Sequence, residues 1–219
     1  NCGIMDQFAS VFGKAGSLMR LDCRSLEFKY FPFDPKGYKL VLLNSQVKHD
    51  LASSAYNDRR KSCENVVAAM KKHWPNVDSL RDATYDMLDE VRPEVSEEDA
   101  LRAKYVIGEK YRVLEVCVAL EEGDYEEVGK KMYETHYGLS KEYEVSCPEL
   151  DFLNDVAHSC GVTGSRIMGG GFGGCTINLV SDDLYANFIE TAKKAYKEKF
   201  GKEPIVIDVV IGDGSRKLC

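Results

Sequence analysis

Residues 165–180 read SRIMGGGFGGCTINLV, and the order of elements around this stretch indicates the class of fold. Two apolar runs flank a cluster of glycines, which predicts a strand, a glycine loop and a second strand. A helical pattern follows at 182–200, and the apolar run PIVIDVV at 204–210 predicts a last strand. Because a long helical block precedes these elements, the order predicts an α+β fold and not a regularly alternating parallel sheet.

The glycine loop matches two well-known nucleotide-binding patterns only superficially. Gly169, Gly171 and Gly174 have the spacing G-x-G-x-x-G, but a dinucleotide fingerprint requires a helix directly afterwards, and CTINLV predicts a strand. A protein-kinase glycine loop does precede a strand, but no VAIK, HRD or DFG motif follows here. Two interpretations stay open: a wide turn that lets two strands meet a neighbouring element, and a loop that faces a ligand.

Three extended runs precede the helical block, at residues 16–22, 26–33 and 38–45. The alternation of Leu26, Phe28 and Tyr30 predicts a half-exposed strand, whereas the nearly continuous apolar letters at 41–43 predict a central one. Residues 34–37, Asp-Pro-Lys-Gly, supply a turn between the second and third runs.

The helical block extends from about residue 53 to residue 143. Ser96 precedes three acidic residues and predicts the start of a long helix, since a serine can cap the first turn and acids favour its positive end. Five apolar residues at helical spacing predict a stripe that faces the core: Ala103, Ile107, Tyr111, Leu114 and Val118.

The composition is that of a folded globular protein of 219 residues, with 44% hydrophobic and 30% charged residues. A net charge of −7 argues against a general nucleic-acid or anionic-membrane binder, because such a surface repels phosphates. No apolar run approaches the roughly 20 residues that span a bilayer, and no signal-peptide pattern is present. We therefore expect no nucleic-acid partner, no membrane partner and a cytoplasmic location.

The eight cysteines are scattered, without a CxxC pair or a Cys/His cluster at metal-ligand spacing. They predict reduced, mostly buried thiols and no metal site of their own. The chain opens with Asn1 directly before an apolar helical pattern, so we expect it to start in the middle of a longer protein.

Asp6 stands out within the helical pattern at 4–12 because its neighbours are apolar. Ile4, Met5 and Phe8 indicate a helix that is about to be buried, where an isolated carboxylate is unfavourable. The carboxylate can be a capping or dipole-favourable acid in the first turn. It can also be a general base at the floor of a pocket, and the composition does not decide between the two.

The stretch KHDLASSAYNDRRKSCE at 48–64 joins a strand end to a helix, where loops often carry function. Taken singly, His49 and Tyr56 fit ordinary packing or surface positions. The pair Arg59 and Arg60 fits a solvated helix face.

Five segments together resemble the galactokinases, a family of the GHMP kinase superfamily. The segments are CGIMDQFAS, LDCRSLEFKYFPF, KHDLASSAYNDRRKSCE, VSCPELDFLN and GSRIMGGGFGGCTINLV. They extend over nearly the whole chain in the same order, which is more specific than any single motif. MGGGFGGC resembles the third motif of the superfamily, and GIMDQ resembles the segment with the catalytic aspartate.

The resemblance implies functions for individual residues. Asp6 matches the aspartate regarded as the base that takes the proton from the anomeric hydroxyl of galactose. Gly3 and Tyr56 match positions that contact the sugar. Three glycines match those that pack close to the substrate and to the phosphate-binding loop: Gly169, Gly170 and Gly171.

The resemblance also implies galactose and ATP as substrates and Mg²⁺ as cofactor. Two family motifs and the acidic Mg²⁺ ligand are not among these 219 residues. One missing motif supplies an arginine beside the catalytic aspartate, and the other surrounds the ATP phosphates. We therefore expect a C-terminal part of a galactokinase, which makes galactose 1-phosphate only together with its N-terminal lobe and is inactive alone.

Two alternatives stay open under this resemblance. One is a galactokinase-like protein that senses galactose and ATP without turning them over. The other is a kinase of N-acetylgalactosamine, because the residues that make room for an acetamide group cannot be assigned.

For the architecture, the resemblance implies a remnant of the N-terminal lobe at 1–36, which carries Asp6, and a GHMP kinase C-terminal domain at 37–219. We expect the C-terminal lobe to contain a ferredoxin-like antiparallel sheet with helices. Its four strands are expected near 38–45, 164–168, 174–180 and 204–210.

Overall fold

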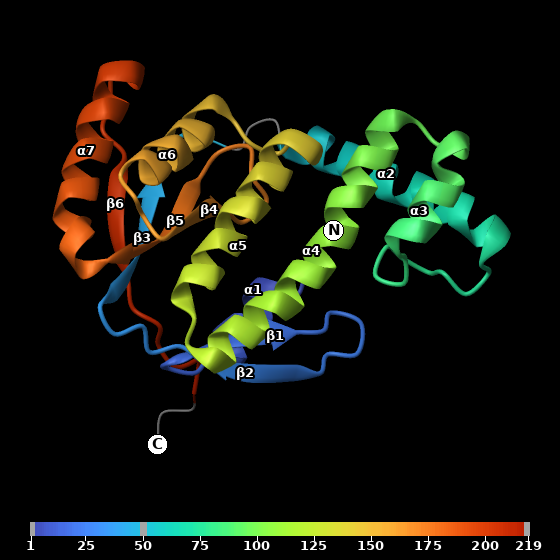
Figure 1. Ribbon diagram of the computed structural model, residues 1–219, viewed down its shortest axis with the longest axis horizontal. Helices are drawn as coiled ribbons and strands as arrows, with labels where there is room; N and C mark the ends of the chain where they lie inside the picture. The colour runs from blue at the N-terminus through green and yellow to red at the C-terminus, as the bar shows by residue number, and fades with distance from the viewer. Residues whose placement is uncertain (1–2, 49–51, 217–219) are drawn as a thin grey trace.

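A computed structural model describes residues 3–48 and 52–216 (Figure 1). The helices are α1 (Met5–Phe12), α2 (Ala52–His73), α3 (Tyr85–Val91), α4 (Glu97–Glu122), α5 (Tyr125–Tyr137), α6 (Pro148–Ser159) and α7 (Asp182–Phe200). The strands are β1 (Ser17–Leu21), β2 (Phe28–Pro32), β3 (Tyr38–Asn44), β4 (Gly164–Met168), β5 (Cys175–Ser181) and β6 (Ile205–Val209).

The four predicted strands form one antiparallel sheet in the order β4-β5-β3-β6. β3 lies inside this sheet, with Leu42 opposite Ile177 of β5 and Ile207 of β6. Val41 and Leu43 of β3 are fully buried, as expected for the continuous apolar run. The α+β class and the ferredoxin-like sheet are confirmed.

Each face of the sheet contributes to a different part of the core. Val41 and Leu43 pack with Leu153 of α6 and Phe188 of α7, which cover one face of the sheet. On the other face, Leu179 packs with a cluster that includes residues of β2, α4 and α5, and Leu40 is adjacent to this cluster. In Figure 1, α6 and α7 lie at one end of the molecule and α2 and α3 at the other, with α4 and α5 between them.

The long helix α4 changes its packing partner along its length. Ser96 caps its start, because the Ser96 hydroxyl accepts a hydrogen bond from the Asp99 amide at 3.0 Å, as predicted. Ala103 and Ile107 are buried against α2 and α3. The rest of the predicted stripe is wrong, since three of its residues are 38–52% exposed: Tyr111, Leu114 and Val118.

The second half of α4 buries a different face. Cys117, Ala119 and Leu120 are its buried residues there, and they belong to the same cluster as Phe31 of β2. A single straight stripe cannot serve both partners, so the helix of 26 residues presents one face to α2 and α3 and another to β2.

β1 and β2 form a separate antiparallel hairpin that carries α1. The ring of Phe28 lies 5.2 Å from that of Phe8 and 5.4 Å from that of Phe12. Phe8 is the buried residue of α1, whereas Met5 is 61% and Val11 is 54% exposed. The prediction of a buried first helix is therefore wrong for this chain, because α1 contacts the hairpin through one edge only.

The end of α1 is tied to the segment that follows β6. The Gly214 amide donates to the Gly13 carbonyl at 2.7 Å, and the Ser215 amide donates to the Ser10 carbonyl at 2.7 Å. The predicted turn before β3 is also present, with the Tyr38 amide bonded to the Pro35 carbonyl at 3.0 Å. Leu26, predicted as part of a strand, lies in the hairpin turn with a φ of 63°.

The burial of the cysteines and the apolar character of the helices were also predicted from the sequence. Of the six cysteines in the described ranges, Cys117 is buried, four are half-buried and Cys23 is exposed, so the prediction of mostly buried thiols is wrong. Within the same ranges, no helix has the length and apolar character needed to cross a membrane.

Phe188→Ala should lower the free energy of unfolding by about 3–5 kcal/mol, since it removes a fully buried ring between α7 and the sheet. Val210→Ala is the control, because Val210 is 91% exposed, and it should change stability by about 0.5 kcal/mol at most. Urea titration followed by circular dichroism measures both values. Equal effects of the two substitutions would contradict the packing described for the sheet.

Candidate functional site

The glycine loop between β4 and β5 approaches other backbone segments too closely for side chains. A β carbon on Gly171 would lie 2.1 Å from the Val145 carbonyl oxygen, and one on Gly173 would lie 2.6 Å from the Val47 carbonyl oxygen. Gly171 also has a φ of 81°, which favours glycine. This part of the loop fits the interpretation of a wide turn against a neighbouring element.

Hydrogen bonds hold the loop on both sides. The Phe172 amide donates to the Val145 carbonyl at 2.6 Å, and the Gly174 amide donates to the Val47 carbonyl at 3.2 Å. The Ser45 amide donates back to the Gly174 carbonyl at 2.8 Å. The loop therefore joins the segment after α5 to the segment after β3.

The first two glycines of the loop are in a different environment. Gly169 and Gly170 are exposed, and an added β carbon on either would meet nothing within 4 Å. This half of the loop is accessible, and its backbone is not covered by side chains of its own. Whether it faces a ligand stays a prediction.

Arg59 of α2 connects that helix to the loop. Its Nε donates to the Tyr143 carbonyl at 2.8 Å and its Nη2 donates to the Glu144 carbonyl at 2.6 Å. Its guanidinium lies over the ring of Phe172, 5.8 Å from the ring centre. The interpretation of Arg59 as a solvated residue is wrong, because its side chain is only 12% exposed.

Its neighbour Arg60 does occupy a solvated helix face, where it pairs with Glu64 at 2.8 Å. The sequence offers no signal that separates the two arginines, since the carbonyl partners of Arg59 are 84 and 85 residues away.

A second arginine fixes the segment that supports the loop. Arg102 of α4 is buried and donates to the Ser62 hydroxyl at 2.9 Å and to the Glu144 carboxylate at 2.9 Å. Glu144 has a φ of 53°, an uncommon conformation for a residue with a side chain. The contacts of Arg59 and Arg102 hold this residue in place.

Asp151 at the start of α6 stabilises the same region. Its carboxylate accepts hydrogen bonds from the hydroxyls of Ser140, at 2.9 Å, and Ser146, at 2.5 Å. His136 lies 3.3 Å from it. Burial acts to raise the pKa of Asp151, but the hydrogen bonds from His136, Ser146 and Ser140 outweigh burial and hold this pKa below its usual range.

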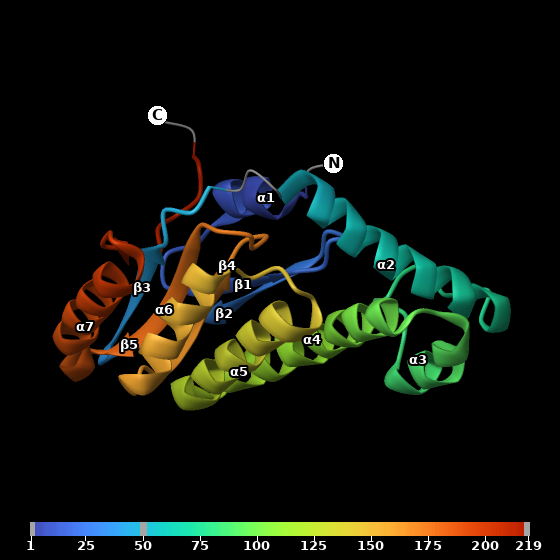
Figure 2. The ribbon, with the colours of Figure 1, turned by 90° about the horizontal axis from the view of Figure 1, so that it is seen from above.

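The predicted sugar-side residues lie on α1 and α2. Gly3 and Asp6 are exposed at the start of α1, and Tyr56 is 53% exposed, one turn before Arg59 on α2. Ile4 is the N-cap residue of α1, so Asp6 occupies the first turn and not the cap. Figure 2 shows α1 and the start of α2 on the same side of the molecule.

The structure connects only some of these residues. Tyr56 lies on the same helix as Arg59, whose guanidinium lies over Phe172 of the glycine loop. In the part of the chain that the structure describes, no hydrogen bond joins Asp6 to Tyr56 or to the loop, and the Asp6 carbonyl accepts the Ser10 hydroxyl at 2.8 Å. His49 lies outside the described residues. Across 3–48 and 52–216, no three His, Cys, Asp or Glu side chains are placed to hold a metal ion.

Alanine substitutions along the glycine loop should have graded effects on stability. Gly171→Ala combines a left-handed backbone with the contact to Val145, so it should lower the free energy of unfolding by at least about 1–2 kcal/mol. Gly169→Ala, at a φ of 80° without a clash, should cost about 1 kcal/mol. Gly170→Ala should be nearly neutral. Chemical denaturation measures the series, and a cost at Gly170 equal to that at Gly171 would contradict this geometry.

Comparison with known proteins gives the relationships of the chain. The family model for GHMP kinases C terminal matches residues 117–198. The chain is 42% identical to the galactokinase of Clostridium beijerinckii over 220 residues, which cover 100% of this chain and 56% of that protein. It is also 42% identical to the galactokinase of Homo sapiens over 219 residues, which cover 100% of this chain and 54% of that protein.

A solved structure gives the same result. The crystal structure of Lactococcus lactis galactokinase complexed with galactose superimposes with a TM-score of 0.93 at 31% identity, over 100% of this chain and 56% of that one. The chain thus spans slightly more than half the length of the curated relatives it matches. The resemblance to the galactokinases is confirmed, and residues 117–198 match the family model for GHMP kinases C terminal.

Proposed function

We propose that this chain is part of a galactokinase, which transfers the terminal phosphoryl group of ATP to the anomeric hydroxyl of galactose. The observation that carries the proposal is the similarity over the entire chain. Identity of 42% to galactokinases and a TM-score of 0.93 to a galactokinase complexed with galactose extend over the same residues. Both α1, with Asp6, and the glycine loop fall inside this similarity.

Phosphoryl transfer defines what each part of the site must do. Its transition state is loose, so catalysis comes mainly from positioning the two substrates and from neutralising charge on the transferred group. The acceptor hydroxyl must also lose its proton. A carboxylate in the first turn of an exposed helix is accessible to a sugar hydroxyl, and we assign this function to Asp6.

The sugar and the loop occupy neighbouring parts of the proposed site. We propose that galactose lies between α1 and α2. Gly3, just before α1, would contact it on one side and Tyr56 of α2 on the other. Gly169 and Gly170 offer exposed backbone without side chains, which allows close approach of a substrate or of a phosphate-binding segment. Gly171 is buried; we propose that it supports this part of the site near the substrate, because its contact with Val145 keeps the loop in place.

ATP is the proposed phosphate donor and Mg²⁺ its proposed counter-ion. The described residues do not supply a set of metal ligands, so no step is assigned to Mg²⁺ on this chain. We propose that both bind mainly through the N-terminal lobe of the same protein, and that this chain contributes the acceptor side. A cytoplasmic enzyme without nucleic-acid or membrane partners is part of the same proposal.

Asp6→Asn tests the assignment of the base in the intact protein, including any sequence before Asn1. The amide keeps the shape of the carboxylate but cannot accept the proton, so kcat with galactose should fall by about 10²–10⁴-fold. A coupled assay of ADP release measures kcat and KM. Asp86→Asn is the matched control, since Asp86 is an exposed acid in the first turn of α3, and it should leave kcat unchanged.

Wild-type turnover by Asp6→Asn would overturn the function assigned to Asp6. The same assay also tests the sugar. Faster phosphorylation of N-acetylgalactosamine than of galactose would change the proposed substrate. Binding of galactose and ATP without ADP release would favour a sensor.

A further inference from the structure

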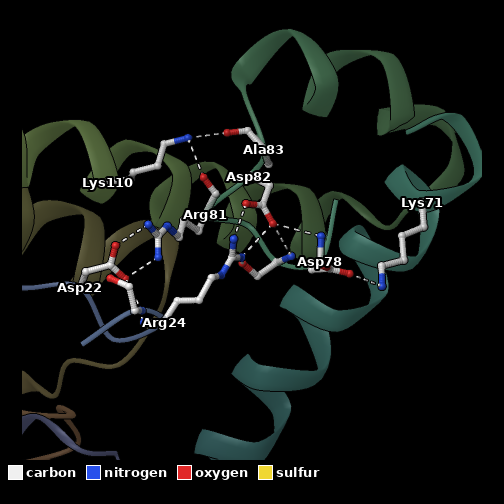
Figure 3. Close-up of polar contacts among 10 residues, drawn as sticks. Asp22, Arg24, Lys71, Asp78, Arg81, Asp82, Ala83 and Lys110 are labelled. Atoms are coloured by element: carbon white, nitrogen blue, oxygen red, sulfur yellow. Dashed lines mark hydrogen bonds and ion pairs between the residues drawn. The ribbon is translucent and has the colours of Figure 1, made fainter. Parts of the chain in front are cut away.

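The β1–β2 hairpin meets the loop between α2 and α3 through two crossed ion pairs (Figure 3). Asp22 of the hairpin turn accepts hydrogen bonds from both terminal nitrogens of Arg81. Arg24 donates to the two oxygens of Asp82 at 2.8 and 2.9 Å, and to the Ser79 hydroxyl at 2.8 Å. Each segment therefore gives one acid and one base to the other, and we name the four charged residues the hairpin latch.

The hairpin side of the latch is ordered by its own backbone. Asp22 also accepts hydrogen bonds from the amides of Arg24, at 2.9 Å, and Ser25, at 3.2 Å. The Leu26 amide closes the turn by donating to the Asp22 carbonyl at 2.8 Å. The hydrogen bond from Arg81, followed by those from the two amides, lowers the pKa of Asp22 to about 2, so the latch is charged at neutral pH.

The other side of the latch, the loop between α2 and α3, is also held by hydrogen bonds. The Asp82 carboxylate accepts hydrogen bonds from the amides of Asp78, at 3.0 Å, and Ser79, at 3.1 Å. Lys110 of α4 donates to the Ala83 carbonyl at 2.6 Å. The loop that receives the hairpin is thereby attached to the helices around it.

The hairpin has its other attachment near the C-terminal end of α4, whereas Lys110, beside the latch, lies near the middle of that helix. Phe31 is 2% exposed against Cys117 and Leu120, and Lys29 pairs with Glu121 at 2.6 Å. A cavity of about 440 Å³ lies beside this second attachment, among the hairpin, α4, α5 and the sheet; its lining includes Phe31 and Cys117 together with Met19, Arg20, Met132 and Ile177. Packing alone therefore does not fix the tilt of the hairpin over this space.

Movement of the hairpin would be passed to α1. Phe28 packs on Phe8 and Phe12, and the Tyr30 hydroxyl donates to the Phe12 carbonyl at 2.5 Å. The end of α1 is held by residues 213–215. A tilt of the hairpin would therefore turn α1 about its end and displace its first turn.

The loop between α2 and α3, which carries Arg81 and Asp82, is also connected to the glycine loop through a helix. It follows the end of α2, and the start of the same 22-residue helix carries Tyr56 and Arg59. A rigid helix thus connects the hairpin latch to the segment that contacts the glycine loop.

We propose that the hairpin latch positions α1, and with it Asp6, relative to α2 and the glycine loop. Its four members are positioning residues, and their effect on catalysis rests on the proposed function of Asp6. The paired side chains are 24–49% exposed, so they add little to the overall stability. Two-pronged arginine–carboxylate pairs do fix orientation, which is what the hairpin requires.

Arg24→Ala/Arg81→Ala in the intact protein removes both pairs and leaves the acids that order the two turns. Amide hydrogen exchange in β1, β2 and α1 should be faster by about tenfold or more, whereas exchange in β5 and α7 should not change. The kcat for galactose phosphorylation should fall at least about tenfold, with KM for ATP within about twofold of the wild type, because the base is displaced and not removed.

Two further variants separate positioning from a general loss of stability. Arg24→Lys/Arg81→Lys keeps the charges but loses the two-pronged geometry, so its exchange rates and kcat should be intermediate. Arg92→Ala removes an exposed arginine that pairs with Glu97 in the same helical block, away from the hairpin, and should behave like the wild type.

The outcomes are distinguishable. Unchanged exchange in the hairpin and α1 would overturn the latch, whatever the kinetics. Faster exchange with wild-type kcat would overturn its positioning function. If the wild-type protein does not phosphorylate galactose, the proposed function fails, and the exchange measurement still decides whether the latch holds the hairpin.

Discussion

The contact between Gly171 and the Val145 carbonyl is the constraint on which the site depends. It requires a residue without a side chain, and it brings the β4–β5 turn against the segment that follows α5. Arg59 and Arg102 then bind the same segment from α2 and α4. Three elements that are far apart in the sequence are thereby joined, by the backbone carbonyls of Tyr143, Glu144 and Val145 and by the Glu144 carboxylate.

The molecule also shows how one helix can serve two structural units. The first half of α4 packs with α2 and α3, and its second half covers β2. The hairpin is attached near the C-terminal end of α4 by packing at Phe31, and beside the middle of that helix by charge at Asp22 and Arg24. Because α1 is carried by this hairpin, the position of Asp6 depends on contacts far from it in the sequence. The division of the chain at residues 36 and 37 stays a prediction.

Local patterns predicted the elements well, and long-range contacts explain what they missed. The apolar run at 41–43 and the cap at Ser96 depend on neighbouring residues, so the sequence indicates them directly. The exposed positions Leu114 and Val118 were misjudged because apolar spacing does not show where a helix changes its partner.

For the site, the glycine cluster indicates that the loop backbone lies close to another segment. It does not indicate that this segment is the one with the Val145 carbonyl. Arg59 could not be recognised, since its partners are determined by the tertiary fold. The hairpin latch was missed for the same reason: Arg24 and Asp82 are 58 residues apart, and a charged pair in each loop is common on protein surfaces.

The central claim is that Asp6 takes the proton from the anomeric hydroxyl of a galactose bound between α1 and α2. A crystal structure of the intact protein with galactose and a non-hydrolysable ATP analogue tests this most directly. The account predicts that a carboxylate oxygen of Asp6 lies about 2.6–3.2 Å from the anomeric oxygen of the sugar. A sugar bound with that oxygen beyond hydrogen-bonding reach of Asp6, directly or through one water, would contradict it.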